Sequence, residues 1–246
     1  MDEDTDPEIP RYLILIIIII IVILLIPYLY SLRKINTQDI LRYHYYINLD
    51  HRTDRKKFTI KELQKLGIYN PRRFRAIKKD IGIVGCNMSH LEVLKLARRN
   101  KLPYVTIFED DILFLEPKET LEKLDRIVNS DIEWDVILLG GNNHKPYQSI
   151  NEDCIKVNNC QTRTAYIVKN SYYDTLIDQW SYALEKLLVT KPGREYESYR
   201  GDQSWKPLQR RDNFLLIIPL NVVQKEGYSD IEKRNVNYVS SMKDIK

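Results

Sequence analysis

Residues 104–111 read Tyr-Val-Thr-Ile-Phe-Glu-Asp-Asp, and this stretch is the most informative one in the chain. Its first five residues are β-branched or aromatic, which predicts a buried strand. The strand runs into three carboxylates, although a desolvated carboxylate is costly unless it is paired or binds a cation. In α/β proteins, ligands bind beyond the carboxyl ends of the strands. In an α/β fold, the stretch therefore predicts a ligand site at the end of this strand.

The three carboxylates indicate what that ligand site binds. Alternation along a strand places Glu109 and Asp111 on one side of the chain and Asp110 on the other. Carboxylate oxygens suit a hard divalent cation such as Mn²⁺ or Mg²⁺, which often bridges to substrate phosphates. The alternative is a solvated exit from the strand into a loop.

The rest of the chain alternates strand-like and helix-like stretches. The strand-like stretches are residues 43–48, 74–77, 104–108, 135–139, 155–157, 165–168 and 215–218. The helix-like stretches are residues 53–66, 86–99, 117–128 and 171–188. This order predicts one α/β domain over residues 43–246 with a mostly parallel central sheet.

The N-terminal region has a different composition. Residues 12–32 carry no charge and residues 13–26 are all aliphatic. As a helix, such a segment spans about 30 Å, the thickness of a bilayer core. It predicts one transmembrane anchor at residues 12–32, after a tail (1–11) and before a short stem (33–42). A cleaved signal peptide is disfavoured, because the preceding residues are acidic and no small-residue cleavage site follows.

The charges that flank the anchor bear on its orientation. Arg11 is the one cation before the anchor, whereas Arg33, Lys34 and Arg42 follow it. The positive-inside rule therefore favours a cytosolic domain.

Overall composition excludes several classes of protein. The net charge is +4, 43% of residues are hydrophobic, and the basic residues are scattered, so no nucleic-acid partner is expected. The sequence has no Walker A loop, G-x-G-x-x-G, G-x-S-x-G, H-E-x-x-H or paired C-x-x-C motif, which disfavours the common kinases, dinucleotide enzymes, hydrolases and zinc proteins. The spacing of Cys154 and Cys160 does not decide whether they form a disulfide.

A second candidate stretch, residues 45–55, joins the first predicted strand to a helix. Thr53 can cap that helix, whose first N–H groups are then free for an anion. The arginines could add bidentate contacts to phosphate. The alternative is a capped helix with a surface Arg–Asp pair. The residues that could face a nucleotide here are Asn48, Asp50, Arg52 and Arg55.

Two glycine-containing stretches are further candidates. Residues 82–90 read as a loop that enters an amphipathic helix, with Ser89 and His90 in its first turn. For His90, the alternative is a purely structural role as a hydrogen-bonding residue. Gly140 and Gly141 follow a buried strand and permit close approach of a ligand to the backbone, unless they only form a turn.

Residues 201–205 read Gly-Asp-Gln-Ser-Trp. A carboxylate beside an aromatic ring suits a sugar, because the ring packs on C–H groups while Asp202 accepts from hydroxyls. The alternative is a helix N-cap at Asp202 with Trp205 in the core.

In this order, the stretches resemble glycosyltransferase family 25, which includes lipooligosaccharide and collagen hydroxylysine galactosyltransferases. The matching motifs lie in residues 46–55, 85–90, 109–114, 134–140, 164–166 and 224–231. The anchor departs from the bacterial members, which are typically cytoplasmic or peripheral. The chain is also much shorter than the collagen-modifying members, which are lumenal.

The resemblance implies a GT-A (Rossmann-like) fold, a nucleotide-sugar donor, most often UDP-galactose, and usually Mn²⁺. By analogy, Asp111 would bind the metal directly, and Glu109 and Asp110 would reach the metal, its waters or the ribose. The family is thought to invert the anomeric centre, which needs a base for the acceptor hydroxyl, and Asp202 is the candidate. The residues implied to line the nucleotide or donor pocket are Asn48, Asp50, Arg55, Ser89 and His90.

The resemblance thus predicts a membrane-anchored, metal-dependent enzyme that transfers a hexose, galactose from UDP-galactose, to a glycan or hydroxylated protein acceptor. Analogy with members resident in the endoplasmic reticulum favours a type II anchor with a lumenal domain in the ER or Golgi, against the flanking charges. Two alternatives stay open. One is an inactive domain of the same fold that binds a glycan or a partner, and the other is a metal-dependent enzyme of phosphoryl chemistry.

Overall fold

The structure is a computed structural model that describes residues 10–33 and 35–244, with the side chains of residues 11 and 27–33 outside the description. The chain divides into two units, Met1–Ile35 and Asn36–Lys246.

The described residues of the first unit include helix α1 (Arg11–Arg33). Among the side chains that the structure describes, no helix combines the length and the apolarity that a membrane crossing requires. The side chains of residues 27–32, part of the predicted anchor, are outside the description. Residues 1–9 of the predicted tail lie outside the described residues. The anchor therefore stays a prediction.

The second unit contains an eight-stranded sheet made of β1 (His44–Asn48), β2 (Arg73–Arg75), β3 (Tyr104–Glu109), β5 (Val136–Asn143), β6 (Tyr147–Ser149), β7 (Cys154–Val157), β8 (Cys160–Lys169) and β9 (Phe214–Ile217). The strand order is β2-β1-β3-β8-β5-β9-β7-β6. β7 and β8 run against the other strands, which share one direction. This confirms the predicted α/β class and the mostly parallel sheet.

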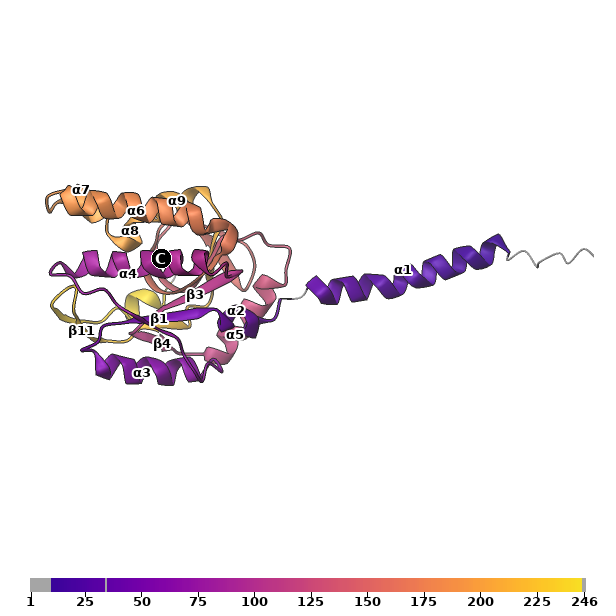
Figure 1. The fold of residues 1–246 in the computed structure, drawn as a ribbon, viewed down its shortest axis with the longest axis horizontal. Coiled ribbons are helices and arrows are strands. Elements are labelled where there is room, and N and C mark those ends of the chain that lie inside the picture. Colours follow the sequence, from indigo (N-terminus) through magenta and orange to yellow (C-terminus); the bar gives the residue numbers. More distant parts are fainter. Residues whose placement is uncertain (1–9, 34, 245–246) are drawn as a thin grey trace, which may run out of the picture. The chain divides into compact units, whose positions relative to one another are not determined.

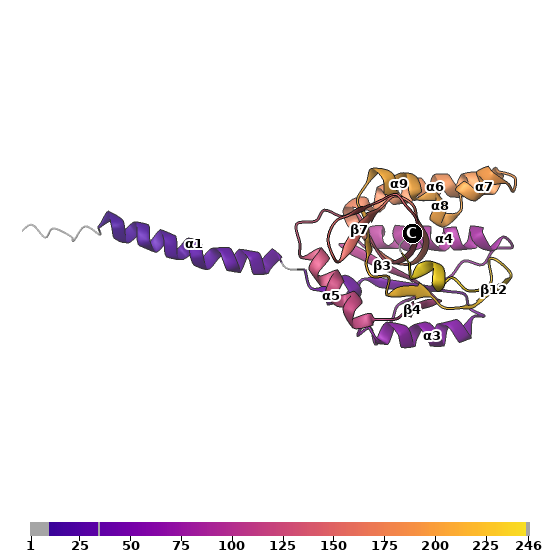
Figure 2. The same cartoon turned by 180° about the vertical axis from the view of Figure 1, so that it is seen from behind.

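Helices cover both faces of this sheet, as Figures 1 and 2 show from opposite sides. They are α4 (Gly82–Arg99) and α6 (Tyr173–Val189) on one face, and α3 (Thr53–Gln64) and α5 (Pro117–Val128) on the other. Val105, Ile107 and Phe108 on β3 are all 0% exposed. A strand covered on both faces needs apolar residues at successive positions, which explains the unbroken apolar run before the carboxylates.

The end of the predicted stem belongs to the packed unit. Residues 37–42 form helix α2 (Thr37–Arg42), on which Ile40 and Leu41 are buried. The packed unit therefore begins earlier in the chain than residue 43, which the sequence pattern alone indicates as its start.

Short elements complete the end of the sheet where the carboxylates lie. β4 (Ile112–Phe114) pairs with β10 (Val222–Gln224), and β11 (Gly227–Ser229) forms a hairpin with β12 (Arg234–Val236). Because β4 follows directly after the carboxylates, its pairing with β10 fixes where they lie, and Lys225 N donates to the backbone oxygen of Asp111 at 2.7 Å. The remaining short helices are α7 (Arg194–Ser198), α8 (Gly201–Ser204), α9 (Lys206–Arg211) and the 3-10 turns Asn170–Tyr172 and Ser240–Met242.

The predicted start of α4 is wrong. The helix begins at Gly82 rather than at Cys86, so Ser89 and His90 lie in its interior and not in its first turn. A Cβ atom on Gly85 would lie 2.3 Å from the carbonyl oxygen of Ile77. The glycine therefore lets the preceding loop cross the helix closely, and it marks no helix boundary.

One other local prediction and two of the alternatives are also wrong. Thr53 is the first residue of α3 and does not cap it, because Arg52 occupies the N-cap and no side chain caps the helix. Asp202 lies inside α8, whose N-cap is Arg200. Gly140 and Gly141 lie within β5 rather than in a turn after it.

The packing around β5 explains both of its glycines. A Cβ atom on Gly140 would lie 2.2 Å from the carbonyl oxygen of Val222, and one on Gly141 would lie 2.3 Å from Cys160 Sγ. Neighbouring parts of the protein, rather than a ligand, occupy the space beside them.

Candidate active site

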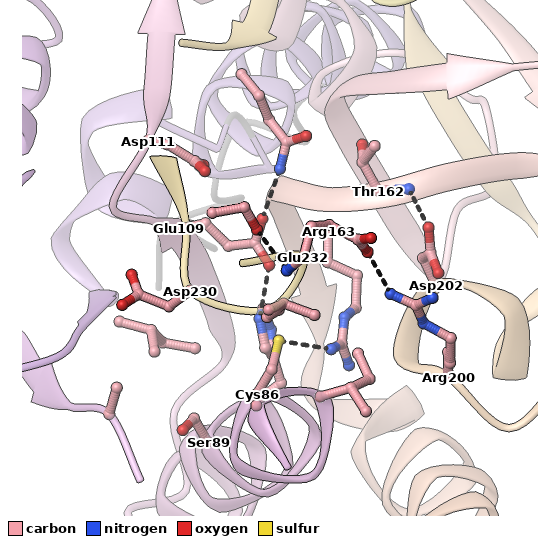
Figure 3. Close-up of a pocket in the computed structure, with 18 of the residues that line it drawn as sticks. Cys86, Ser89, Glu109, Asp111, Thr162, Arg163, Arg200, Asp202, Asp230 and Glu232 are labelled. Atoms are coloured by element: carbon pink, nitrogen blue, oxygen red, sulfur yellow. Dashed lines mark hydrogen bonds and ion pairs between the residues drawn. The ribbon is translucent and has the colours of Figure 1, made fainter. Parts of the chain in front are cut away.

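A cavity of about 890 Å³ lies beyond the carboxyl ends of β1 and β3. Figure 3 shows side chains from several elements converging on it. Its walls come from the three carboxylates after β3, from α4, from the start of β8, from α7 and α8, and from the β11–β12 hairpin. This is the end of the sheet at which the sequence pattern predicts the site.

Asp110 is fully engaged by neighbouring side chains. Asn48 Nδ2 and Arg55 Nη1 each donate to its carboxylate at 2.7 Å. Burial raises the pKa of Asp110, and the Arg55 charge and these hydrogen bonds oppose the rise. Asp110 therefore holds the loop after β3 in place and has little capacity left for a ligand.

Only one of the two carboxylate oxygens of Asp111 has a hydrogen-bond donor among the described residues. Its Oδ2 accepts from Arg55 Nη1 at 3.0 Å, whereas its Oδ1 is buried without a hydrogen-bond partner among the described residues. Burial, and then the nearby charge of Glu109, raise the pKa of Asp111 to about 7. A buried oxygen with no donor is unfavourable, so this carboxylate is arranged for a group that is not part of the chain.

Glu109 lies at the end of a buried hydrogen-bonded chain. Its Oε1 is 3.1 Å from His90 Nε2, and its Oε2 accepts from Gln224 Nε2 at 3.1 Å. His90 Nδ1 lies 2.8 Å from the Tyr166 hydroxyl. Burial raises the pKa of Glu109 and lowers the pKa of His90 well below its usual range, so the imidazole is neutral. The tautomer that satisfies every partner has Nε2–H donating to Glu109 and Nδ1 accepting from Tyr166.

Asp202 lies on another wall of the cavity. Its Oδ2 accepts from the backbone N–H of Thr162 at 3.0 Å, and its Oδ1 is 3.4 Å from Gln203 Nε2. Thr162 has a φ of 71°, which is unusual for a β-branched residue. Such backbone strain is often found at functional sites.

The cavity also collects polar atoms that have no partner. Asp111 Oδ1, Asn142 Oδ1 and Thr162 Oγ1 are all buried without a hydrogen bond in the described part of the chain, and all three residues line this cavity. Native proteins leave few such atoms unpaired. A polar ligand in this cavity would supply partners for three of the eight such atoms among the described residues.

The residues singled out from the sequence divide into two groups. Those that line the cavity are Arg55, Ser89, His90, Glu109, Asp110, Asp111 and Asp202, and those that do not are Asn48, Asp50, Arg52, Gly140 and Gly141.

Three candidates from residues 45–55 contact other side chains instead of lining the cavity. They are Asn48, Asp50 and Arg52. Asn48 Oδ1 accepts from Arg73 Nε at 3.0 Å, and Asp50 accepts from Arg73 Nη2 at 2.8 Å. Arg52 forms ion pairs with Asp54 and Asp230.

Ser89 supports the cavity wall through its hydroxyl. Its Oγ donates to the carbonyl oxygen of Gly85 at 2.7 Å and accepts from Ile77 N at 2.8 Å. Ser89 therefore fixes the loop at residue 77, which forms part of the wall.

The interpretation of the sequence missed Arg163, which lines the cavity from β8. Its Nη2 donates to Asn87 Oδ1 at 2.9 Å and lies 3.2 Å from Cys86 Sγ. An arginine just before an apolar strand reads as a surface residue, so the sequence carries no strong signal for it. Cys86 and Gln224 also line the cavity, and both lie in stretches that carry the family resemblance.

Two sets of residues could hold a metal. Cys86, His90 and Glu109 place potential ligand atoms within 4.8 Å of one another. The Arg163 guanidinium beside Cys86 Sγ repels a cation, and burial raises the pKa of the Cys86 thiol to about 11. The oxygens of Asp111 and Glu109 therefore fit a hard divalent cation better than the thiol-containing set.

Residues 80–188 match the sequence profile of glycosyltransferase family 25, described as an LPS biosynthesis protein family. The match contains α4, the three carboxylates and β8, and it confirms the resemblance predicted from the motifs. Arg55 and Asp202 lie outside it. No curated protein sequence matches the chain.

Solved structures resemble the chain at low identity. One is a glycosyltransferase involved in glycosylation of the major capsid of PBCV-1, with 11% identity, a TM-score of 0.39, and coverage of 71% of this chain and 92% of that one. Another is mannose-1-phosphate geranyltransferase from Thermus thermophilus, with 9% identity, a TM-score of 0.42, and coverage of 71% and 73%. A third is a Drosophila β-1,4-galactosyltransferase in complex with manganese, UDP-Gal and xylobiose, with 8% identity, a TM-score of 0.33, and coverage of 78% and 97%. At these values the similarity carries no argument about function.

Proposed function

We propose, from the premise that residues 80–188 carry a glycosyltransferase family 25 sequence, that the chain is a metal-dependent glycosyltransferase of GT-A fold. It transfers a hexose, galactose from UDP-galactose, to a glycan or hydroxylated protein acceptor. The observation that carries this proposal is the buried, unpaired Oδ1 of Asp111, beside Glu109, in a cavity of about 890 Å³. That volume lies within the range of small-molecule sites, about 300–1,000 Å³.

The chain's residues fit a hard divalent cation, Mn²⁺ or Mg²⁺. Asp111 offers an oxygen that nothing else satisfies, and the charge of Glu109 lies close enough to raise the pKa of Asp111. When bound there, the cation supplies positive charge that neutralises the donor diphosphate. Asp110 contributes indirectly, because Arg55 and Asn48 already occupy it.

The surrounding residues keep these carboxylates in position. Arg55 Nη1 contacts both Asp110 and Asp111, at 2.7 and 3.0 Å, and so fixes their relative placement. Neutral His90 orients Glu109 from behind. Because these contacts exist before any ligand arrives, little reorganisation accompanies binding.

Asp202 is the group placed to accept the acceptor's proton. The Thr162 N–H fixes one of its oxygens, and the other has only a long contact to Gln203. A carboxylate in hydrogen-bond reach of the acceptor hydroxyl acts as a general base in an inverting transfer. In that role the acceptor oxygen attacks the sugar from the side opposite the departing diphosphate.

The membrane location is a further part of the proposal. Residues 12–32 form a type II anchor, and the catalytic domain lies in the lumen of the ER or Golgi. Uncharged composition and length support the anchor. Protease treatment of sealed microsomes that carry a C-terminally tagged chain tests the orientation. Protection without detergent supports the lumen, and digestion without detergent supports the cytosolic orientation that the flanking charges favour.

UDP release from a panel of UDP-sugars tests the enzymatic proposal, with the full chain in detergent micelles and Mn²⁺. We expect turnover with at least one sugar, loss of it in Asp111→Asn, and retention in Asp131→Asn, a matched change at an exposed residue. A folded Asp111→Asn variant with full turnover would contradict the proposal. Sugar-nucleotide binding without turnover in the wild type would favour a binding module. Equal activity on simple phosphate esters would favour phosphoryl chemistry.

A further inference from the structure

Arg163 is a buried cation without an anionic partner. It is 4% exposed, and its hydrogen bonds within the described part of the chain all come from Nη2, to Asn87 Oδ1 and Cys86 Sγ. Both partners are neutral, since burial raises the pKa of the Cys86 thiol to about 11. In the described part of the chain, no carboxylate lies within ion-pair distance of its guanidinium, and its Nε and Nη1 have no hydrogen-bond partner.

The fold holds this guanidinium in place from three helices. Asn87 on α4 accepts its hydrogen bond, and the ring of Trp180 on α6 lies 5.1 Å below it. On α8, a Cβ atom at Gly201 would lie 2.0 Å from the guanidinium carbon, so only glycine leaves room for it. A buried charge is costly unless it is paired, and the contact with Trp180 offsets only part of that cost. The arrangement is that of a site prepared for an anion.

The position of Arg163 relates it to both groups of carboxylates. Phe108 on β3 pairs with Ala165 on β8, and the two strands are antiparallel. Arg163, two residues before Ala165, therefore lies on β8 beyond the level at which β3 ends. Figure 3 shows its side chain between Glu109 and Asp202. Both carboxylates act on it electrostatically, yet neither forms an ion pair with it.

One ligand satisfies both unpaired parts of this cavity. Among the described residues, Asp111 Oδ1 has no hydrogen-bond partner and Arg163 has no anionic partner. A metal-bound diphosphate presents positive charge to the carboxylates and phosphate oxygens to a guanidinium. The planar fork of arginine matches two phosphate oxygens at once.

We propose that Arg163 binds the diphosphate of the nucleotide-sugar donor and stabilises it as the leaving group. This inference rests on the proposed function. In the transfer, the acceptor oxygen bonds to C1 of the sugar while the bond from C1 to the phosphate oxygen breaks. The electron pair leaves with the diphosphate, and the acceptor proton passes to Asp202. Arg163, with a permanent charge, faces the developing negative charge.

Calorimetric titration of the full chain in detergent micelles with Mn²⁺ tests this, with UDP, uridine and inorganic pyrophosphate as ligands. We expect Arg163→Gln to weaken UDP and pyrophosphate binding by about 30-fold and to leave uridine binding unchanged, because a charge-assisted hydrogen bond is lost. Arg163→Lys keeps the charge without the fork, so its loss is about 10-fold. Arg99→Gln removes an exposed arginine from the same chain and serves as the matched control.

A second variant tests the inference if Arg163→Gln does not fold. Gly201→Ala keeps the arginine but fills the space that its guanidinium occupies, and it should weaken UDP binding while uridine binding persists. Thermal unfolding of each variant shows whether it is folded.

The outcomes separate the two proposals. Equal UDP affinity in the wild type and in folded Arg163→Gln overturns the role of Arg163, while the glycosyltransferase proposal stands. Pyrophosphate binding that depends on Arg163, without any preference for UDP, supports the anion site and contradicts the nucleotide donor. If the wild type binds neither UDP nor pyrophosphate, both proposals fail.

Discussion

Two walls of the same cavity are built on different physical principles. The inner wall, consisting of Glu109, His90 and Arg163, lies on the sheet and α4, with Tyr166 behind His90, and its polar groups are mostly buried. The outer wall is the hairpin of residues 227–236.

The outer wall is joined to the rest of the protein mainly through charged groups near the surface. Arg52 pairs with Asp230, Arg200 pairs with Glu232 at 2.8 Å, and Arg55 Nη2 donates to the carbonyl oxygen of Tyr228 at 2.9 Å. Buried polar networks are strong when complete and costly when broken, whereas exposed ion pairs contribute little. The inner wall is therefore suited to fixing reactive groups, and the outer wall tolerates change.

The largest expected effect is on catalysis by Asp111, the lining carboxylate with an unpaired oxygen among the described residues. Asp111→Asn should lower UDP release from the donor about 1000-fold, since it removes the oxygen that fits the metal and so the charge on the diphosphate. A steady-state assay across Mn²⁺ concentrations measures this. If excess Mn²⁺ restores full turnover in the variant, Asp111 is dispensable for catalysis.

His90 belongs to the inner wall and His51 contacts Asp230 of the outer wall, which allows a matched comparison of stability. His90→Ala breaks the link between Glu109 and Tyr166 and leaves a void, so the free energy of unfolding should fall by about 3 kcal/mol. His51→Ala removes only a half-exposed pair with Asp230 and should lower it by less than about 1 kcal/mol. Denaturant unfolding of both variants gives the difference. Equal losses would remove the distinction between the walls.

Lowering the pH should change the contributions of Asp111 and of Asp230, in the outer wall, to the free energy of unfolding in opposite directions. Burial and Glu109 raise the pKa of Asp111 to about 7, so the metal-free folded state takes up a proton before the unfolded chain does. The free energy of unfolding should therefore rise by on the order of 2 kcal/mol as the pH falls from 8 to 5. Burial works to raise the pKa of Asp230, but its hydrogen bonds from Arg52 and His51 outweigh burial and lower it. The stability that this residue contributes is lost below about pH 4.

Denaturant unfolding at a series of pH values, with a chelator present, measures how the free energy of unfolding depends on pH. It covers both the limb between pH 8 and 5 and the acid limb below about pH 4. Asp111→Asn should flatten the limb between pH 8 and 5 and leave the acid limb unchanged. Identical profiles in the wild type and the variant would show that Asp111 titrates normally.

The smallest expected effect lies in the outer wall. A double-mutant cycle of Arg52→Ala and Asp230→Ala should give a coupling below about 1 kcal/mol that shrinks further at 1 M salt. Unfolding measurements at two ionic strengths provide it. A coupling of several kcal/mol that is insensitive to salt would place the hairpin among the buried, fixed parts of the site.

The sequence predicted the parts of this site that depend on local pattern. An apolar strand that runs into carboxylates identifies a sheet end and a polar site without knowledge of the rest of the fold. For the same reason the position of the three carboxylates could be predicted from residues 104–111, and the α/β class from the alternation of strand-like and helix-like stretches along the chain.

What the sequence could not predict depends on contacts between distant segments. Gly85 and Gly140 looked like loop or ligand-facing glycines, but Ile77 and Val222 occupy the space beside them. Arg163 carries no local signal of burial, because its burial depends on segments that lie far from it in the chain. These segments contribute Asn87, Trp180 and Gly201.

The most informative single measurement is the coupling between Mn²⁺ and UDP, obtained by titrating UDP into the full chain with and without Mn²⁺. If the carboxylates hold a cation that in turn holds the diphosphate, Mn²⁺ should raise UDP affinity at least about 10-fold, and UDP should raise Mn²⁺ affinity by the same factor. In Asp111→Asn this coupling should disappear. Equal UDP affinity in the wild type with and without Mn²⁺ would contradict the proposal that the carboxylates and the diphosphate share a metal.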